Sequence, residues 1–154
     1  MSSLKRILRR NEIAFGYRLG YLFNHYSVPV YKWTAAELGI QRPEFATLFC
    51  IAHLESPTAS DVVELTGIPK NTVSRAVSRL MKMGMVRRAA DSADGRRAML
   101  SLTAKGTRLY QAVLPRFQER QDSMLSVLTA AERQQLHALL NKLVERDDDW
   151  AQAG

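Results

Sequence analysis

The alternation of apolar and polar positions is most informative between residues 58 and 104. A short helical pattern over Asp61–Leu65 ends at a Thr66-Gly67 turn. A second helix is predicted to begin at Pro69, because proline lacks an N–H and already has a helical φ. At 100° per residue, one stripe of this helix is apolar and must be buried: Pro69, Val73, Ala76, Val77 and Leu80. Two helices joined by a glycine turn predict a helix-turn-helix.

The opposite stripe of the second helix is polar. It offers amide, hydroxyl and guanidinium groups and no carboxylate, a combination that fits the major groove of DNA. Asn71, Arg75, Ser78 and Lys82 lie on this stripe, with Thr72 and Arg79 at its edge. We therefore expect DNA contacts from the helix residues Lys70, Asn71, Thr72, Ser74, Arg75, Ser78, Arg79 and Lys82.

A basic β-hairpin is predicted directly after the second helix. Gly84 is placed to cap that helix. Val86-Arg87-Arg88 predicts a strand, and the alternation over Ala98–Leu102 predicts a returning strand. The intervening residues 91–95 (DSADG) are typical of a turn, and Arg96-Arg97 lies at the tip of the hairpin or just past it. A basic hairpin beside a recognition helix is typical of a wing, which can place an arginine in the narrow, electronegative minor groove.

The N-terminal part of the chain predicts further helices. Residues 4–39 are apolar enough to predict a long first helix that is buried on several sides. Pro29 is expected to kink or split it, because a proline inside a helix removes a hydrogen bond and clashes one turn back. Residues 43–54 predict another helix. The break at 56–58 is a place where a short strand could complete the sheet.

Two more helices are predicted at the C-terminal end. Thr103 is placed to cap a helix over about 104–127, which Pro115 is expected to bend, and Thr129–Glu132 is a capping box that opens a last helix. The last helix has a narrow apolar stripe: Leu136, Leu139, Leu140, Leu143 and Val144. A chain of this size has little core left for these helices and the first one, so we infer that they pair with a second subunit. The alternative is that the stripes cap the core of the monomer itself.

The positive charge of the chain is concentrated on the predicted DNA-binding segment. The formal net charge is +7. Lys70–Arg97 holds eight basic and two acidic residues, whereas the segment from Glu119 to the end holds four basic and seven acidic ones. A polyanionic partner at the basic segment follows from this asymmetry. The 154 residues, 46% of them hydrophobic and 24% charged, are typical of a globular protein of one domain or slightly more.

Other classes of protein find little support in the sequence. There is no nucleophile elbow, phosphate-binding glycine loop or metal-binding pair, so we expect neither an enzyme nor a bound cofactor or metal. The three histidines, His25, His53 and His137, are far apart. A transmembrane run and a signal peptide are not expected. The single cysteine, Cys50, is predicted to be a buried core thiol, and the lack of a disulfide partner suits a cytoplasmic location.

The wing and the helix that follows resemble those of the MarR (multiple antibiotic resistance regulator) family. The family pattern D-x-x-D-x-R…L-T-x-x-G is matched by Asp91, Asp94, Arg96, Leu102, Thr103 and Gly106, and TVSRAVSRLMKMGMVRR resembles its recognition helix and first wing strand. The resemblance implies a mainly α (α+β) winged helix-turn-helix fold in a single domain, 1–154. Residues 43–103 would form the DNA-binding lobe, and residues 4–42 and 104–150 the dimerisation helices. Asp91 and Asp94 are expected to support the wing, Asp94 through the backbone or by pairing with Arg96.

The same resemblance implies an effector site. Members of the family usually bind a small ligand between the dimerisation helices and the DNA-binding lobe. On the first helix, Arg18, Tyr21 and His25 share a face by their i, i+3, i+7 spacing. A guanidinium can hold a carboxylate while rings stack on a planar ligand, so an aromatic acid or its coenzyme A thioester is our hypothesis for the effector. The alternative is that Arg18 and His25 are interface or surface groups among ordinary core aromatics.

The predicted function is transcriptional repression by a homodimer that binds a pseudo-palindromic operator and is released by the effector. Two alternatives stay open. A nonspecific DNA-compacting protein would show no preference for a palindromic site over random DNA. A winged helix that serves protein contacts would not bind DNA at physiological salt.

Overall fold

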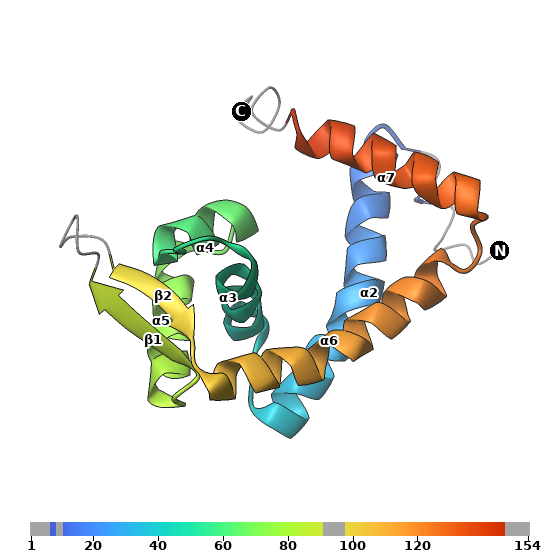
Figure 1. Cartoon of the computed structure of the whole chain (residues 1–154). Helices are drawn as coiled ribbons and strands as arrows, with labels where there is room; N and C mark the ends of the chain where they lie inside the picture. Colours follow the sequence, from blue (N-terminus) through green and yellow to red (C-terminus); the bar gives the residue numbers. More distant parts are fainter. Residues whose placement is uncertain (1–6, 9–10, 91–97, 147–154) are drawn as a thin grey trace. The chain divides into compact units, whose positions relative to one another are not determined.

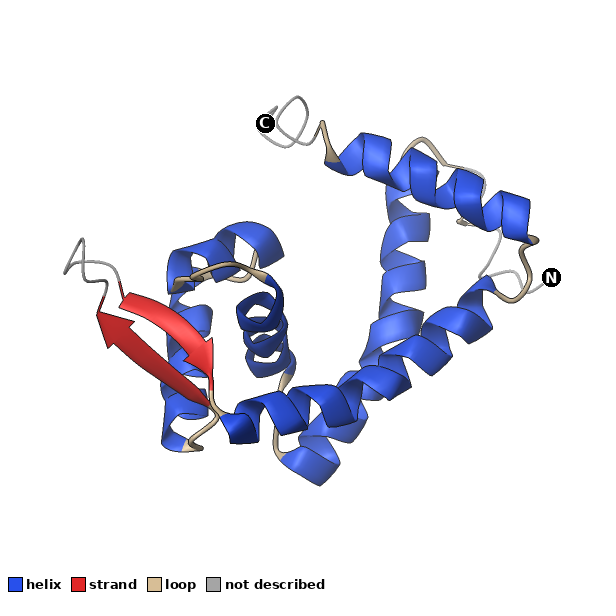
Figure 2. Ribbon diagram, in the orientation of Figure 1, coloured by secondary structure: helices blue, strands red, loops and turns tan. Residues whose placement is uncertain are grey.

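The structure of the chain is a computed structural model that describes residues 7–8, 11–90 and 98–146. It is mostly helical with one small antiparallel sheet, as the sequence predicted (Figures 1 and 2). The helices are α2 (Ala14–Leu38), α3 (Arg42–His53), α4 (Ala59–Thr66), α5 (Lys70–Lys82), α6 (Ala104–Leu125) and α7 (Ala130–Val144); the strands are β1 (Val86–Ala90) and β2 (Ala98–Leu102). The chain divides into two compact units, Met1–Phe117 and Gln118–Gly154.

Local capping interactions define the helix-turn-helix of the first unit. The side chain of Thr58 accepts the Asp61 N–H, and Asp61 in turn accepts the Thr58 N–H, so a capping box begins α4. Gly67 ends α4 with φ 63°, a left-handed conformation that glycine adopts without strain. Pro69 is the N-cap of α5, so the helix begins one residue later than predicted. Pro69 is also exposed, so its predicted place on the buried stripe is wrong. The carbonyl of Pro69 nevertheless starts the helix by accepting the Thr72 and Val73 N–H groups.

The apolar stripe of α5 forms the centre of the core of this unit. Val73, Ala76, Val77 and Leu80 are buried, as the helical period predicted. Val73, Val77 and Leu80 belong to one core cluster with buried residues of α3, α4 and the sheet: Leu48, Ile51, Val62, Val86 and Leu100. The apolar face of α5 therefore packs into the core, which leaves the opposite face of the helix outside it.

The wing strands pair as predicted, but the third strand does not form. β1 and β2 are antiparallel, with Val86 opposite Leu102 and Ala90 opposite Ala98. Residues 56–58 contain no strand, and the sheet has two strands within the described chain. The Leu100 N–H donates a single hydrogen bond to the Pro57 carbonyl at 2.7 Å. A strand would need further donors from this segment; Pro57 has no N–H, and Ser56 has φ 51°, outside the extended region.

The start of α6 is fastened to the turn between α5 and β1. The Thr103 hydroxyl donates to the Gly84 carbonyl at 2.7 Å and accepts the Gly106 N–H at 3.1 Å, and the Thr103 N–H donates to the Met85 carbonyl at 3.0 Å. A Cβ on Gly106 would overlap the carbonyl of Met85. Thr103 therefore caps α6 as predicted, and Gly106 allows the first turn of the helix to lie directly against the backbone.

Helix α2 differs from its prediction in three respects. Among the described residues the helix begins at Ala14, and it ends at Leu38. Pro29 lies inside it without dividing it. The helix was expected to be buried on several sides, but only Ala14, Ser27, Val30 and Thr34 are buried, while Phe15 and Tyr17 are each 61% exposed. Most large apolar residues of its first half are therefore exposed within the described part of this chain: Phe15, Tyr17, Leu19, Leu22 and Phe23.

Aromatic rings join α2, α3 and α6 within the first unit. Phe45 of α3 stacks on Phe117 of α6 with ring centroids 5.0 Å apart, and on Tyr110 at 5.8 Å. Tyr31 of α2 meets Phe45 and Phe117 edge-on. These rings are the apolar connection between the long helix and the helix-turn-helix lobe.

The second unit contains the end of α6 and α7. α6 ends at Leu125, two residues before the predicted end, and Pro115 lies within it. The predicted capping box of α7 is present, with the Thr129 side chain accepting the Glu132 N–H and the Glu132 carboxylate accepting the Thr129 N–H. The hydrogen bonds from Thr129 also lower the pKa of the Glu132 carboxyl. No residue of α7 is buried, and Leu139 and Leu143 of its apolar stripe are exposed.

Candidate nucleic-acid interface

The face of α5 opposite the core is a continuous polar surface. Most of the helix residues predicted to contact DNA are exposed: Lys70, Asn71, Ser74, Arg75, Ser78, Arg79 and Lys82. Thr72 is half-buried at the edge, as its place on the helical wheel predicted. A shallow hollow of about 330 Å³ lies among Ser74, Arg75, Ser78, Arg79 and Lys82. The structure thus brings the predicted residues of α5 together on one accessible face.

This face is electropositive and rich in hydrogen-bond donors. α5 contains four cationic side chains and no acidic residue. The adjoining strand adds Arg87 and Arg88, both exposed, and Arg87 Nε donates to Ser101 Oγ at 2.8 Å. Guanidinium and amide groups can each form two parallel hydrogen bonds with a base edge, and cations attract phosphates. A surface of this chemistry can bind double-stranded DNA.

Four of the predicted wing residues lie outside the described part of the chain. These are Asp91, Asp94, Arg96 and Arg97, which fall in the segment 91–97. Ala90 and Ala98, which flank this segment, pair with each other at the end of the described sheet. The two strands of the predicted hairpin are therefore present, while the contacts of the four wing residues stay predictions.

Arg79 has surroundings that the helical wheel did not indicate. Its guanidinium Nη1 lies 3.2 Å from Glu44 Oε1, and its Nη2 donates to the Gly39 carbonyl at 2.7 Å. Both partners belong to the segment where α2 ends and α3 begins. The side chain of Arg79 is thus on the polar face of α5 and bound to the lobe behind it at the same time.

The predicted effector residues are only partly brought together. Tyr21 and His25 stack with ring centroids 3.9 Å apart, and His25 Nδ1 lies 2.9 Å from the Tyr21 carbonyl oxygen. Arg18 instead donates from Nε to the Leu8 carbonyl at 2.7 Å. A cavity of about 580 Å³ beside α2 is lined by Leu8, Ile13, Gly16, Tyr17, Gly20, Tyr21 and Asn24. Of the three predicted residues, Tyr21 alone lines it.

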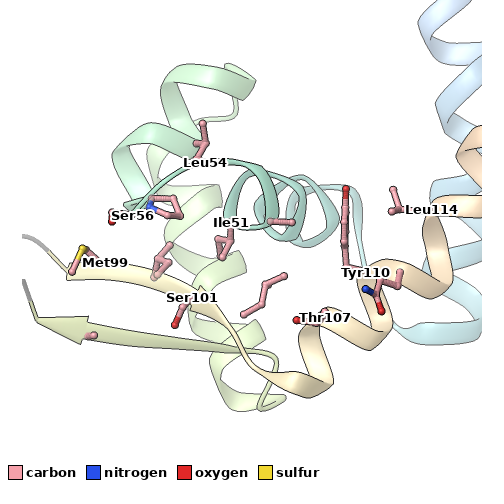
Figure 3. A pocket seen from close by; sticks show the side chains of 14 residues that line it. Ile51, Leu54, Ser56, Met99, Ser101, Thr107, Tyr110 and Leu114 are labelled. Carbon is pink, nitrogen blue, oxygen red and sulfur yellow. The ribbon is translucent and has the colours of Figure 1, made fainter.

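A larger cavity, which the sequence did not indicate, lies between α3, β2 and the start of α6 (Figure 3). Its volume is about 670 Å³. Apolar side chains such as Ile51, Leu54 and Leu114 line it together with the hydroxyl groups of Ser56 and Thr107. No charged side chain is among its lining residues. Because the cavity is assembled from segments far apart in the chain, no local pattern could have revealed it.

The remaining chemical candidates are a core thiol, Cys50, and an exposed histidine, His53. Cys50 is fully buried on α3, and burial raises the pKa of its thiol, which keeps the thiol protonated and slow to react. His53 Nε2 lies 2.6 Å from the Tyr110 hydroxyl oxygen.

None of the described helices is both long enough and apolar enough to span a membrane.

Comparison with known proteins agrees with this geometry. The chain matches the profile of the MarR family over residues 38–97, which cover the helix-turn-helix and the first wing strand. It is 26% identical over 113 residues to the transcriptional regulator HosA of Escherichia coli, covering 73% of this chain and 84% of HosA.

Two solved structures extend the likeness beyond the lobe. A MarR-family regulator from Silicibacter pomeroyi superimposes with a TM-score of 0.76 at 25% identity, over 84% of this chain and 86% of that one. BpsR of Bordetella bronchiseptica, whose DNA binding is regulated by 6-hydroxynicotinic acid, superimposes with a TM-score of 0.69 at 25% identity, over 84% of this chain and 98% of BpsR. The profile match over residues 38–97, the relatives and the winged helix-turn-helix fold agree, and all three make the chain similar to the MarR family of DNA-binding transcriptional regulators.

Proposed function

We propose that this regulator is a homodimeric repressor that binds a pseudo-palindromic operator and releases it when a small molecule binds. The observation that carries the proposal is the polar face of α5, which is exposed, cationic and free of carboxylates. A helix with such a face can lie in the major groove and read base edges, while phosphates fix its position. Two copies related by a two-fold axis would read the two halves of a palindrome.

The residues of the interface divide by their place on the lobe. Asn71 and Arg75 lie on the outward stripe of α5 and are assigned to base edges in the major groove. Arg96 belongs to the wing segment and is assigned to the minor groove and its phosphates. The other members of the proposed interface are Lys70, Thr72, Ser74, Ser78, Arg79, Lys82 and Arg97, with Asp91 and Asp94 supporting the wing.

The proposed dimer is supported by the uncovered apolar surfaces of the terminal helices. In the first unit, Phe15, Leu19, Leu22 and Phe23 of α2 are exposed. In the second unit, Leu139, Leu140, Leu143 and Val144 of α7 are exposed. Apolar surfaces of this extent are uncommon on a protein that stays monomeric. A second copy of the chain offers the same surfaces, and an isologous contact buries both at once.

The proposed effector is a planar aromatic acid or its coenzyme A thioester, bound near Arg18, Tyr21 and His25. The stacked pair of Tyr21 and His25 supports an aromatic ligand. Arg18 would have to exchange its bond to the Leu8 carbonyl for the carboxylate of the ligand. The regulation of BpsR by 6-hydroxynicotinic acid supports the same ligand class.

Competition binding tests the proposal. The operator is found by selecting bound fragments from random DNA, and affinity for it is compared with affinity for a scrambled duplex at physiological salt. Selectivity of about a thousandfold or more is expected of a specific regulator. Equal affinity for both duplexes would identify a DNA-compacting protein, and no binding to either would identify a protein-contact module. Repression itself is tested with a reporter gene placed behind the selected operator.

A further inference from the structure

Arg79 stands apart from the other cations of α5 because it makes a two-pronged contact. Its Nη1 is 3.2 Å from a carboxylate oxygen of Glu44, and its Nη2 donates to the Gly39 carbonyl at 2.7 Å. The planar guanidinium holds both acceptors in one fixed geometry, which an ammonium group cannot do. By contrast, Arg75, one turn earlier on the same helix, has no hydrogen bond or ion pair to any residue within 11–90 or 98–146.

Both acceptors are themselves rigidly held. Gly39 ends α2 in the left-handed conformation, with φ 65°. The next residue, Ile40, donates its N–H to the Thr34 carbonyl, and its carbonyl accepts the Thr34 hydroxyl at 2.9 Å. Glu44 belongs to the first turn of α3, where its other carboxylate oxygen accepts the Gln41 N–H. Residues 39–44 therefore form a fixed corner between the two helices.

The burial of Glu44 indicates that its contact with Arg79 has a structural role. The side chain of Glu44 is 8% exposed, whereas that of Arg79 is 47% exposed. A buried carboxylate needs a cation and hydrogen-bond donors to offset its lost hydration. Arg79 is the cation that the structure supplies to Glu44, so its guanidinium is engaged before any DNA arrives.

We propose that Arg79 is a positioning residue, which fixes the C-terminal half of the recognition helix to the corner where α2 meets α3. This inference rests on the proposed function and narrows the role of one residue of the interface. The two contacts of Arg79, to Glu44 and to Gly39, keep α5 at one angle to the rest of the lobe. A larger fraction of the protein molecules then has the recognition helix in the orientation that enters the major groove. It also connects α5 to α2, so a displacement of the end of α2 would be passed to the recognition helix through the Gly39 carbonyl.

Three substitutions separate positioning from phosphate binding. Arg79→Lys keeps the charge but cannot bind both acceptors. Glu44→Gln removes the ion pair, while its amide oxygen can still accept the Gln41 N–H of the capping box. Lys82→Gln is the matched control, because Lys82 is an exposed cation three residues further along α5 and would act through its charge.

Operator affinity is measured across a salt titration for each variant. Arg79→Lys and Glu44→Gln should each weaken operator binding roughly three- to tenfold. The salt slope, which is the slope of log affinity against log salt concentration, should stay unchanged. Glu44→Gln is the sharper test, because removing a negative charge should by itself strengthen binding to DNA. The double variant should be no weaker than either single one. Lys82→Gln should lower the salt slope by about one unit for each phosphate that the lysine neutralises in the wild-type complex.

Hydrogen exchange provides a readout that does not depend on DNA. In the free protein, Arg79→Lys should speed exchange at the amides of residues 80–83 relative to those of 73–76. Wild-type affinity and exchange in both Arg79→Lys and Glu44→Gln would overturn the inference and leave Arg79 as a phosphate-binding residue. If the wild-type protein shows no operator preference, the proposed function fails, while the exchange measurement still decides the role of Arg79.

Discussion

Individual side chains of the interface are assigned to different parts of the DNA, and substitution separates them. Arg75 is exposed on the outward stripe of α5, so Arg75→Ala should cost about 1–3 kcal/mol for each half-site of the operator and less on random DNA. Arg96 is assigned to the wing, so Arg96→Ala should weaken operator and random DNA more nearly alike. It should also lower the salt slope by about one unit for each phosphate that Arg96 neutralises.

Salt titrations of both variants on operator and scrambled duplexes check this prediction. A dimer contains each substitution twice, so both effects should be doubled relative to a single half-site. If Arg75→Ala were the nonselective variant and Arg96→Ala the selective one, the assignment of helix to bases and wing to backbone would be reversed.

For individual residues, the sequence predicted which face of a helix each side chain lies on better than it predicted which residues that side chain contacts. The stripe of Val73, Ala76, Val77 and Leu80 was predicted correctly, because a 3.6-residue period leaves one arrangement for an amphipathic helix. The contacts of Arg79 with Glu44 and the Gly39 carbonyl were not predicted, because these acceptors lie 35 and 40 residues away in the chain. No helical wheel holds that information. Only the packing of α3 against α5 brings the three residues together.

At the scale of elements, the contact between α6 and the turn before β1 gives a testable prediction. Gly106→Ala should destabilise the protein by about 1–3 kcal/mol, because the added methyl group overlaps the Met85 carbonyl and must push the helix from the turn before β1. Gly16→Ala is the matched control: it also lies in a helix, but a Cβ there meets no described atom within 4 Å. Gly16→Ala should be neutral or stabilise by up to about 1 kcal/mol.

Urea unfolding of both variants measures the difference. Equal stability of the two would show that the first turn of α6 does not need glycine. The resemblance to the family had already marked Gly106 as part of the L-T-x-x-G pattern. Its physical reason needed the structure, because the obstacle is a backbone atom of another element and the sequence does not say which elements touch.

The prediction for α2 shows a different limit of sequence patterns. A high content of apolar residues over 4–39 predicted burial, yet many of these side chains are exposed in the single chain. Apolar composition indicates that a surface must be covered but not by what, since the chain's own core and a second subunit produce the same pattern. The third strand is absent for a local reason instead: Ser56 is outside the extended region and Pro57 has no N–H to donate.

For the whole molecule, the exposed surfaces of α2 and α7 predict association. Sedimentation should show a dimer, and deletion of residues 129–154 should cause dissociation or aggregation, because it removes the apolar stripe of α7. A full-length protein that is folded, soluble and monomeric and still binds its operator tightly would contradict the dimer.

Effector binding is also a property of the whole molecule, because it must link a ligand site to the DNA-binding surface. An aromatic acid or acyl-CoA should raise the melting temperature and weaken operator binding, since it stabilises the form that does not fit DNA. Arg18→Ala should blunt both effects if Arg18 holds the carboxylate. A ligand found by screening that acts equally on Arg18→Ala would place the effector elsewhere.

The burial of Cys50 has a practical consequence for spectroscopy of this protein. It is the only cysteine of the chain, and its side chain is buried on α3 with a thiol whose pKa is raised by burial. Maleimide dyes and nitroxide spin labels react with accessible thiolates, so the native thiol will compete poorly for them. A cysteine introduced at Arg88 on the wing strand can therefore be labelled selectively in the otherwise unmodified protein. In the proposed dimer, the distance between the two labels would report movement of the wings when operator or effector is added.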